Sequence, residues 1–230
     1  MDLIDVTSAS KKIDSQKSII KCMFTISKFI SRPINRRVNI VINEYIRKHT
    51  DCRGLALDAG VGYGASAGEL AKLGFTVHGV DIDPFAFMAS TVYIGYLLQK
   101  PYLVFHGDLN QVELPKWFYD VITCTETLEH ILEDDKVIKK LHDALRHDGI
   151  GIFAVPLGDF FDPHPHRKIE FLGENYELYG HIREYKEEEF LKKLEQAGFR
   201  IIERTVVKGD GGDDPKEYEI LIVCAIKDDY

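Results

Sequence analysis

Three glycines alternate with other residues directly after an apolar run, and an acid flanks them on each side. Asp58 precedes Gly60, Gly62 and Gly64, and Asp81 closes the next apolar run. Glycine tolerates a left-handed backbone and lets a ligand lie directly against the main chain. A carboxylate at the end of the second strand of such a unit accepts hydrogen bonds from ribose hydroxyls. The pattern therefore predicts a nucleoside site.

The kind of nucleoside is a separate question, because Gly62, Gly64 and Ala67 also satisfy the dinucleotide fingerprint G-x-G-x-x-A. Asp58 argues against a dinucleotide, since a carboxylate here would repel a pyrophosphate and attract an ammonium group. S-adenosylmethionine carries a ribose and, at its other end, an α-ammonium. An NAD-binding oxidoreductase, or a nucleotide-binding module without turnover, stays as an alternative.

A second cluster of reactive side chains comes from the sequence ETLEH, which contains Glu126, Glu129 and His130. One interpretation takes His130 or Glu126 as a general base for a hydroxyl proton, with Glu129 pairing locally. Another takes all three, joined by His181 or by a histidine of the 164–166 pair, as ligands of Mg²⁺ or Mn²⁺. Hard oxygens and imidazoles suit these ions. Both interpretations remain open.

Short apolar runs alternate with helical patterns from Arg53 onward. Strand-like runs such as 76–83 and 119–126 are separated by amphipathic segments such as 134–149. This alternation predicts a parallel sheet with helices on both faces. After a helix predicted at 186–198, two final strands joined by a Gly/Asp-rich turn predict an antiparallel pair at the sheet edge.

A loop without secondary structure is predicted at 158–184. Its candidate catalytic residues are His166 and His181, and His164 stands close by. A loop after the fifth strand lies at the carboxyl edge of the sheet, where ligands of open α/β folds bind. Its aromatic residues predict a lid with apolar walls or the packing of a long loop; they are Phe160, Phe161, Phe171, Tyr176, Tyr179 and Tyr185.

Two amphipathic helices are predicted ahead of the α/β core, one at 18–30 and one after Pro33, from apolar residues spaced three and four apart. We therefore expect an N-terminal helical cap at 1–52 and an α/β domain at 53–230. The cap could cover the site or form a dimer contact, and the sequence predicts no oligomeric state.

Charge and cysteine content narrow the choice of partner and compartment. The chain of 230 residues has a net charge of -8, which is not the footprint of a nucleic-acid-binding protein. The segment 11–48 is basic, however, with ten Lys and Arg residues against two acids. The four cysteines form no metal-binding or redox motif and are expected to be reduced and mostly buried. With no signal sequence or membrane span expected, a cytoplasmic protein is predicted.

Several of these features together resemble the class I S-adenosylmethionine-dependent methyltransferases, in particular the type 11 and ubiquinone-pathway O-methyltransferases. The matching segments are DAGVGYG at 58–64, Asp81, HGD at 106–108, YDVITCTETLEH at 119–130, and Gly198-Phe199 before an edge hairpin. The resemblance implies a Rossmann-like sheet of seven strands in the order 3-2-1-4-5-7-6, with strand 7 antiparallel.

The resemblance also implies roles for single residues. Those expected to bind S-adenosylmethionine are Asp58, Ala59, Gly60, Gly62 and Gly64 at the methionine moiety, Asp81 at the ribose, Asp108 at the adenine amino group, Ile82 and Leu109 on the adenine ring, and Thr125 beside the sulfonium. Glu126, Glu129 and His130 resemble the E-x-x-E-H arrangement of ubiquinone-pathway O-methyltransferases and of small-RNA 3′-end 2′-O-methyltransferases, where a metal orients hydroxyls.

The expected activity is therefore methyl transfer from S-adenosylmethionine, with the hydroxyl of a small molecule as the expected acceptor. RNA ribose 2′-O-methylation with a divalent metal is the first alternative. The basic segment 11–48 favours an RNA partner, whereas the acidic remainder of the chain opposes it.

Overall fold

The computed structural model describes most of the chain beyond the N-terminal segment. The described residues are 33–162, 167–171, 174–178, 180–208 and 219–227. The helix predicted at 18–30 and the histidines His164 and His166 lie outside them.

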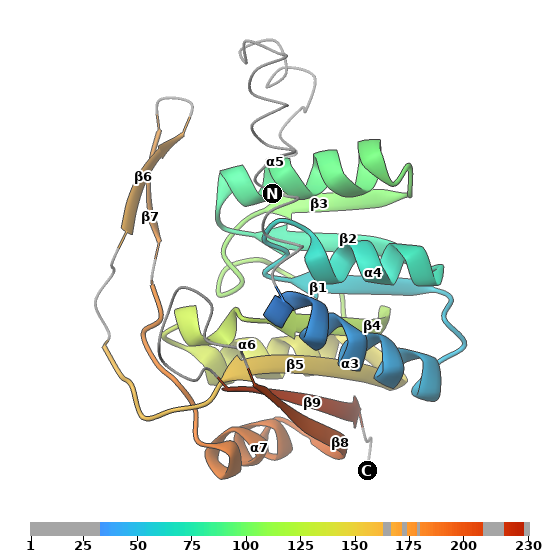
Figure 1. Cartoon of the computed structure of the whole chain (residues 1–230), viewed down its shortest axis with the longest axis vertical. Helices are drawn as coiled ribbons and strands as arrows, with labels where there is room; N and C mark the ends of the chain where they lie inside the picture. Colours follow the sequence, from blue (N-terminus) through green and yellow to red (C-terminus); the bar gives the residue numbers. More distant parts are fainter. Residues whose placement is uncertain (1–32, 163–166, 172–173, 179, 209–218, 228–230) are drawn as a thin grey trace.

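Seven strands of the described residues form one sheet in the order β3-β2-β1-β4-β5-β9-β8 (Figure 1). They are β1 (Leu55–Ala59), β2 (Thr76–Asp81), β3 (Tyr102–His106), β4 (Tyr119–Thr125), β5 (Leu145–Pro156), β8 (Phe199–Lys208) and β9 (Glu219–Lys227). Strands β1 to β5 pair in parallel, and β9 runs antiparallel to both β5 and β8. The predicted Rossmann-like fold, its strand order and the antiparallel edge pair are confirmed.

Helices cover both faces of the sheet, as the alternating pattern predicted. One face carries α3 (Pro33–His49), α4 (Ala65–Leu73) and α5 (Pro84–Ser90), which continues into the π-helical turn η1 (Thr91–Leu97). The other face carries α6 (Asp134–Ala144) and α7 (Glu187–Gln196). Crossover helices on both faces bury the strands between them.

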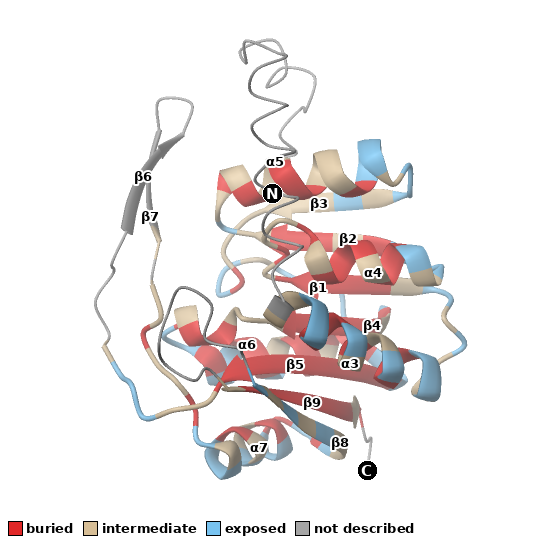
Figure 2. Cartoon of the chain, viewed as in Figure 1, coloured by how far each residue is buried: buried red, intermediate tan, exposed pale blue. Residues whose placement is uncertain are grey.

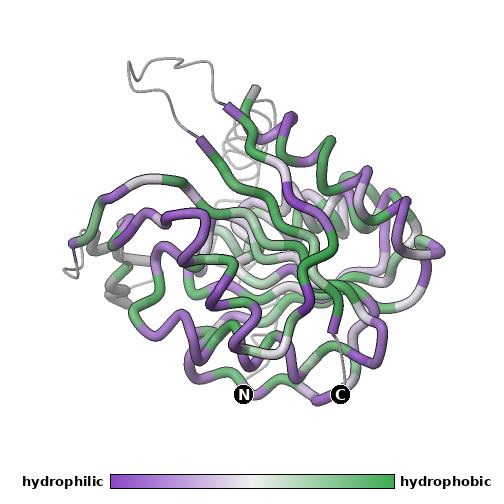
Figure 3. The backbone as a smooth tube through the Cα atoms, turned by 90° about the horizontal axis from the view of Figure 1, so that it is seen from below, coloured by the Kyte–Doolittle hydropathy of each residue, from purple (hydrophilic) through white to green (hydrophobic). Residues whose placement is uncertain are grey.

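Successive strand residues face opposite sides, so the sheet separates two hydrophobic cores. In β5, Ile150 and Ile152 pack in the core under α3 and α4, whereas Phe153 and Val155 pack in the core under α6 and α7. Figure 2 shows the central strands as buried, and Figure 3 shows hydrophobic residues gathered along them with polar residues on the outer helices. This burial fixes the strand ends that carry the site.

The predicted helix after Pro33 is confirmed as α3, and it packs directly on the sheet. Ile42 and Ile46 are fully buried in the core that α3 shares with β1, β4 and β9. The Tyr45 hydroxyl lies 2.6 Å from the Thr205 hydroxyl of β8. The division of the chain at residue 52 stays a prediction, but α3 contributes to the core of the sheet.

The helix predicted at 134–149 is wrong at its C-terminal end. Helix α6 ends at Ala144, and the backbone becomes extended at Leu145, which begins β5. Leu145 is fully buried and pairs with Tyr119 of β4. Sheet pairing therefore overrides the local helical pattern.

The segment predicted as a structureless loop at 158–184 contains regular structure, so that prediction was wrong. Strands β6 (Arg167–Phe171) and β7 (Glu174–Leu178) pair antiparallel in a separate two-stranded sheet. Figure 1 shows this hairpin standing away from the main sheet. Both strands alternate apolar and polar residues, a signal of strand period that the sequence carried.

In the described part of the chain, no helix is both long and apolar enough to span a lipid bilayer. Cys124 and Cys224 are buried free thiols, and Cys52 is a half-buried one.

Candidate functional site

The glycine loop joins β1 to α4 with all three glycines in the left-handed region. The φ angles are 78° at Gly60, 50° at Gly62 and 85° at Gly64. The N–H groups of Gly60 and Val61 donate to the Val80 carbonyl at 2.8 and 3.0 Å, which fastens the loop to β2. A Cβ atom at Gly60 would lie 2.1 Å from Thr127 Oγ1, whereas one at Gly62 would meet open space. Gly60 is therefore required by its close packing against Thr127, whereas Gly62 leaves an open backbone face.

Alanine substitutions at Gly60 and Gly62 distinguish these two roles. Gly60→Ala is expected to lower the free energy of unfolding by roughly 2–5 kcal/mol, because it adds a collision with Thr127 to the backbone strain. Gly62→Ala is expected to cost only the strain, about 1–2 kcal/mol. Urea denaturation of both variants measures the difference, and equal losses would contradict it.

Asp58 joins three elements from inside the fold. Its carboxylate is 1% exposed and accepts hydrogen bonds from the Thr123 hydroxyl of β4 at 2.7 Å and from the Ala67 N–H of α4 at 2.9 Å. Burial raises the pKa of Asp58 to about 7, although both hydrogen bonds oppose the shift. The carboxylate therefore ties β1 to β4 and to the first turn of α4, which follows the glycine loop.

Asp81 lies at the carboxyl end of β2, as predicted, and contacts the glycine loop. Its Oδ2 accepts from Gly62 N–H at 2.7 Å, and its Oδ1 accepts from Asp83 N–H at 2.8 Å. Burial raises the pKa of Asp81 to about 6. Each carboxylate oxygen has a second lone pair, so the group can still accept bonds from a ligand.

The predicted adenine-binding residues lie at the ends of β2 and β3. Ile82 is exposed, and its carbonyl lies 2.9 Å from Nε2 of His106. Asp108 Oδ1 accepts from Asn110 N–H at 2.8 Å, which stabilises a turn, and Leu109 beside it is buried. Asp108 thus has the turn-forming role that an aspartate in this position commonly has, with Ile82 available as an apolar surface nearby.

A cavity of about 110 Å³ opens where the glycine loop meets the end of β4. Gly60, Gly62, Thr125 and Glu126 line it, so the structure brings these predicted residues together. The order of strands reverses between β1 and β4, which is where open α/β sheets bind ligands. Asp81 and Asp108 do not line this cavity.

The sequence interpretation missed three polar residues of the cavity wall: Asn35 and Asn39 of α3 and Ser66 of α4. The Ser66 hydroxyl lies 3.2 Å from the Thr125 hydroxyl and 3.4 Å from Asn39 Oδ1. A signal was present, because the two asparagines continue, four residues apart, the helix face that Ile42 and Ile46 bury. Amides on a buried helix face indicate a polar contact.

The residues of the ETLEH segment lie in two places: Glu126 is at the cavity, whereas Glu129 and His130 lie next to His181. Glu126 has a φ of 51°, rare for a residue with a side chain, and lines the cavity. Glu129, from the short 3₁₀ turn η2 (Leu128–His130), is 0% exposed. Its Oε1 lies 3.8 Å from Nε2 of His130 and 3.8 Å from Nε2 of His181. The predicted association of Glu129, His130 and His181 is thus present, and Glu126 lies outside this group of three.

The ionisable side chains of Glu129, His130 and His181 can together bind a cation or a proton. Burial, and then the Glu126 carboxylate, raise the pKa of Glu129 well above its ordinary value, which the backbone N–H groups of Thr127 and Glu129 offset only in part. Burial, and then His130, lower the pKa of His181. No side chain of the described residues donates a hydrogen bond to either Glu129 oxygen.

A divalent cation fits this group on chemical grounds. One ligand atom from each of Glu129, His130 and His181 lies within 4.8 Å of the others. A buried carboxylate without a side-chain donor is costly, and a coordinated cation would compensate it. One carboxylate with two imidazoles also leaves coordination positions open for a substrate.

Comparison with known proteins gives a consistent result. A family model described as a methyltransferase domain matches residues 42–204. The mitochondrial ubiquinone biosynthesis O-methyltransferase of Schizosaccharomyces pombe is 30% identical over 95 residues, which make up 40% of this chain and 34% of that protein. The match therefore spans about a third of the length of this curated relative.

Solved structures share the fold at low sequence identity. Magnesium protoporphyrin IX methyltransferase from Synechocystis PCC 6803, solved with bound SAH, has a TM-score of 0.65 and 19% identity, covering 84% of this chain and 83% of that one. A SAM-dependent methyltransferase structure from Methanosarcina mazei has a TM-score of 0.61 and 17% identity, covering 79% of this chain and 96% of that one.

Proposed function

The chain belongs to the methyltransferase-domain family, and from this premise we propose that it transfers the methyl group of S-adenosylmethionine to a hydroxyl group of a small molecule. The observation that carries the choice of a hydroxyl is the buried Glu129 carboxylate with two imidazoles beside it, at the carboxyl end of β4. Such a group can take up a hydroxyl proton. The O-methyltransferase name of the curated relative also supports the proposal.

The cofactor is proposed to lie along the carboxyl ends of β1, β2 and β3. The methionine moiety is proposed to occupy the cavity at the glycine loop, which Asn35 and Asn39 also line, with Asp58 and Ala59 at the end of β1 next to the loop. Asp81 accepts from the ribose, Asp108 with Ile82 and Leu109 binds the adenine, and Thr125 lies beside the sulfonium. These roles rest on the position of each residue at the sheet edge.

Methyl transfer is an in-line displacement, so the residues of the chain have to orient the acceptor and remove its proton. His181 stays neutral at pH 7 because its pKa is lowered, and its imidazole can therefore accept that proton. Where Glu129, His130 and His181 hold Mg²⁺ or Mn²⁺ instead, the His181 lone pair would be used by the ion, which would supply a positive charge that favours the deprotonated hydroxyl, and the hydroxyl proton would pass to solvent. Glu126 lines the cavity and is placed to orient the acceptor.

Calorimetric titration with S-adenosylhomocysteine, with NAD as the control ligand, tests the cofactor. We expect micromolar binding of S-adenosylhomocysteine and no binding of NAD. Transfer of a radiolabelled methyl group to catechol, with Mn²⁺ present or chelated, then tests the acceptor class. Methylation of RNA but not of catechol, with activity that falls steeply as salt is added, would replace the proposal with the RNA alternative.

The free thiols support a reducing, cytoplasmic compartment.

Cofactor affinity is expected to depend on pH through Asp81. The pKa of this carboxyl is about 6, and only the ionised form accepts from both ribose hydroxyls. Below about pH 6, protonation of Asp81 should therefore lower the affinity for S-adenosylhomocysteine about tenfold per pH unit, in addition to any loss from Asp58, whose pKa is about 7. The weaker binding of Asp81→Asn should lack the Asp81 component, so its profile should be less steep below pH 6. Titrations from pH 5 to 8 measure both, and parallel profiles would exclude Asp81 as the cause.

A further inference from the structure

Two segments that are distant in the sequence supply the histidines of the candidate catalytic group. Glu129 and His130 follow β4, whereas His181 belongs to the stretch that leads from the β6–β7 hairpin to α7. A backbone hydrogen bond joins the segments, from Ile182 N–H to the Glu129 carbonyl at 2.9 Å. Further backbone hydrogen bonds hold the His181 segment to residues 156–162, among them Asp162 N–H to the Ile182 carbonyl at 2.7 Å. Side-chain contacts then add to the orientation of this segment against the loop that carries His130.

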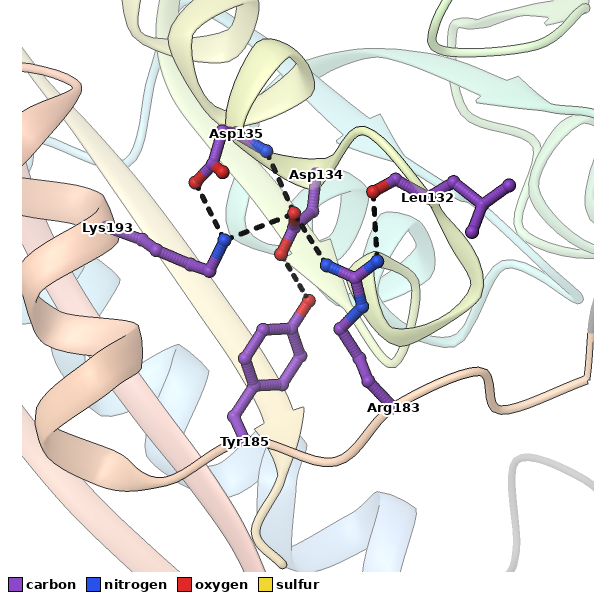
Figure 4. A network of polar contacts seen from close by, with 6 residues as sticks. All are labelled: Leu132, Asp134, Asp135, Arg183, Tyr185 and Lys193. Atoms are coloured by element: carbon purple, nitrogen blue, oxygen red, sulfur yellow. Dashed lines mark hydrogen bonds and ion pairs between the residues drawn. The ribbon is translucent and has the colours of Figure 1, made fainter. Parts of the chain in front are cut away.

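Those contacts converge on Asp134, the first residue of α6, which is 2% exposed. Arg183 Nη1 lies 2.6 Å from Asp134 Oδ1, and the Tyr185 hydroxyl donates to Asp134 Oδ2 at 2.9 Å. Lys193 of α7 lies 3.2 Å from Asp134 Oδ1. Figure 4 shows the three side chains directed at the one carboxylate, Arg183 and Tyr185 from the stretch before α7 and Lys193 from α7 itself.

Arg183 makes a second contact that fixes its plane. Its Nη2 donates to the Leu132 carbonyl at 2.9 Å, in the loop between His130 and α6 (Figure 4). The guanidinium therefore joins the loop and the helix start at once, and a planar fork with two anchors has little freedom to turn. Arg183 is two residues from His181, and Leu132 is two residues from His130.

We infer that Arg183, anchored by the Asp134 carboxylate and the Leu132 carbonyl, is a positioning group that holds the His181 imidazole against Glu129 and His130. The inference rests on the proposed function of that group. The His130 and His181 rings lie edge to face with their centroids 4.9 Å apart. That arrangement depends on the separation of the two segments, to which the Asp134 contacts contribute together with the backbone hydrogen bond from Ile182 to Glu129. None of the Asp134 contacts reaches the cofactor cavity, so their role is limited to the catalytic side.

The test measures the ring arrangement directly. In the full chain labelled at its histidines, the nuclear Overhauser effect between the His130 and His181 rings is expected in the native protein and lost in Arg183→Gln. S-adenosylhomocysteine affinity should stay within about twofold, and kcat for catechol methylation should fall at least about tenfold with an unchanged KM for S-adenosylmethionine. Arg183→Lys, which keeps the charge facing Asp134, should restore part of kcat.

The matched control is Arg204→Gln, which removes a more exposed pair with Glu187 at 3.1 Å and should change neither the ring contact nor kcat. If Arg183→Gln fails to fold, Tyr185→Phe replaces it as the test, because it removes only one hydroxyl from the contacts to Asp134. A weakened ring contact and a lowered kcat are expected in this variant. A native protein without the ring contact, or folded variants that retain it with full kcat, would overturn the inference. A failure of this inference can be distinguished from a failure of the proposed function, because the ring contact is measured without any methyl transfer.

Discussion

Asp81→Ala is expected to lower the affinity for S-adenosylhomocysteine at least about 100-fold, because it removes the carboxylate proposed to accept from both ribose hydroxyls. Hydrogen bonds to a charged group contribute about 1.5–3 kcal/mol each, so the loss of two accounts for a factor of 100 or more. The substitution also removes the acceptor of the Gly62 N–H, which helps to shape the glycine loop. Calorimetric titration measures the change.

The control for this prediction is Asp83→Ala, two residues further on. The Asp83 side chain accepts from Phe85 N–H and Ala86 N–H at the start of α5, so its loss should cost about 1 kcal/mol of stability. Its backbone N–H still donates to Asp81, and cofactor affinity should stay within about threefold. If Asp81→Ala bound as tightly as this control, the proposed cofactor position would be wrong.

Glu129→Gln is expected to abolish most methyl transfer while leaving the cofactor site intact. The substitution removes the carboxylate that faces His130 and His181, and positioned acid–base groups contribute about 10²–10⁴-fold to rate. Transfer to catechol should fall by that factor, Mn²⁺ binding measured by electron paramagnetic resonance should be lost, and S-adenosylhomocysteine affinity should stay within about twofold.

The same variant has a stability signature with a defined sign. Burial raises the pKa of Glu129, so the folded protein holds a proton that the unfolded chain releases, and stability falls as pH rises above the unfolded pKa. Glu129→Gln cannot ionise and should show a flatter profile. Glu133→Gln, at an exposed acid paired with Lys136, is the control and should keep the native profile and native activity. A native rate in Glu129→Gln would exclude the carboxylate from catalysis.

Local chemistry explains what the sequence by itself determined. The glycine loop was predictable because each of its glycines has a positive φ angle, and Gly60 also has a close neighbour that leaves no room for a side chain. The helices and strands follow from periodicities of a few residues, and Asp81 was found because it ends a strand next to that loop. The strand order followed from the resemblance that these motifs carry, and pairing along the sheet confirmed it.

Contacts between distant segments decided the rest. Whether His181 or another histidine joins Glu129 depends on how the chain returns from the hairpin after β5. Backbone hydrogen bonds to residues 156–162 and the buried ion pair of Arg183 with Asp134 fix that return. The burial of Glu129, the asparagines that α3 adds to the cavity, and the end of α6 at Ala144 likewise depend on packing against the sheet. Burial and long-range pairing are properties of the assembled core, so no local pattern determines them.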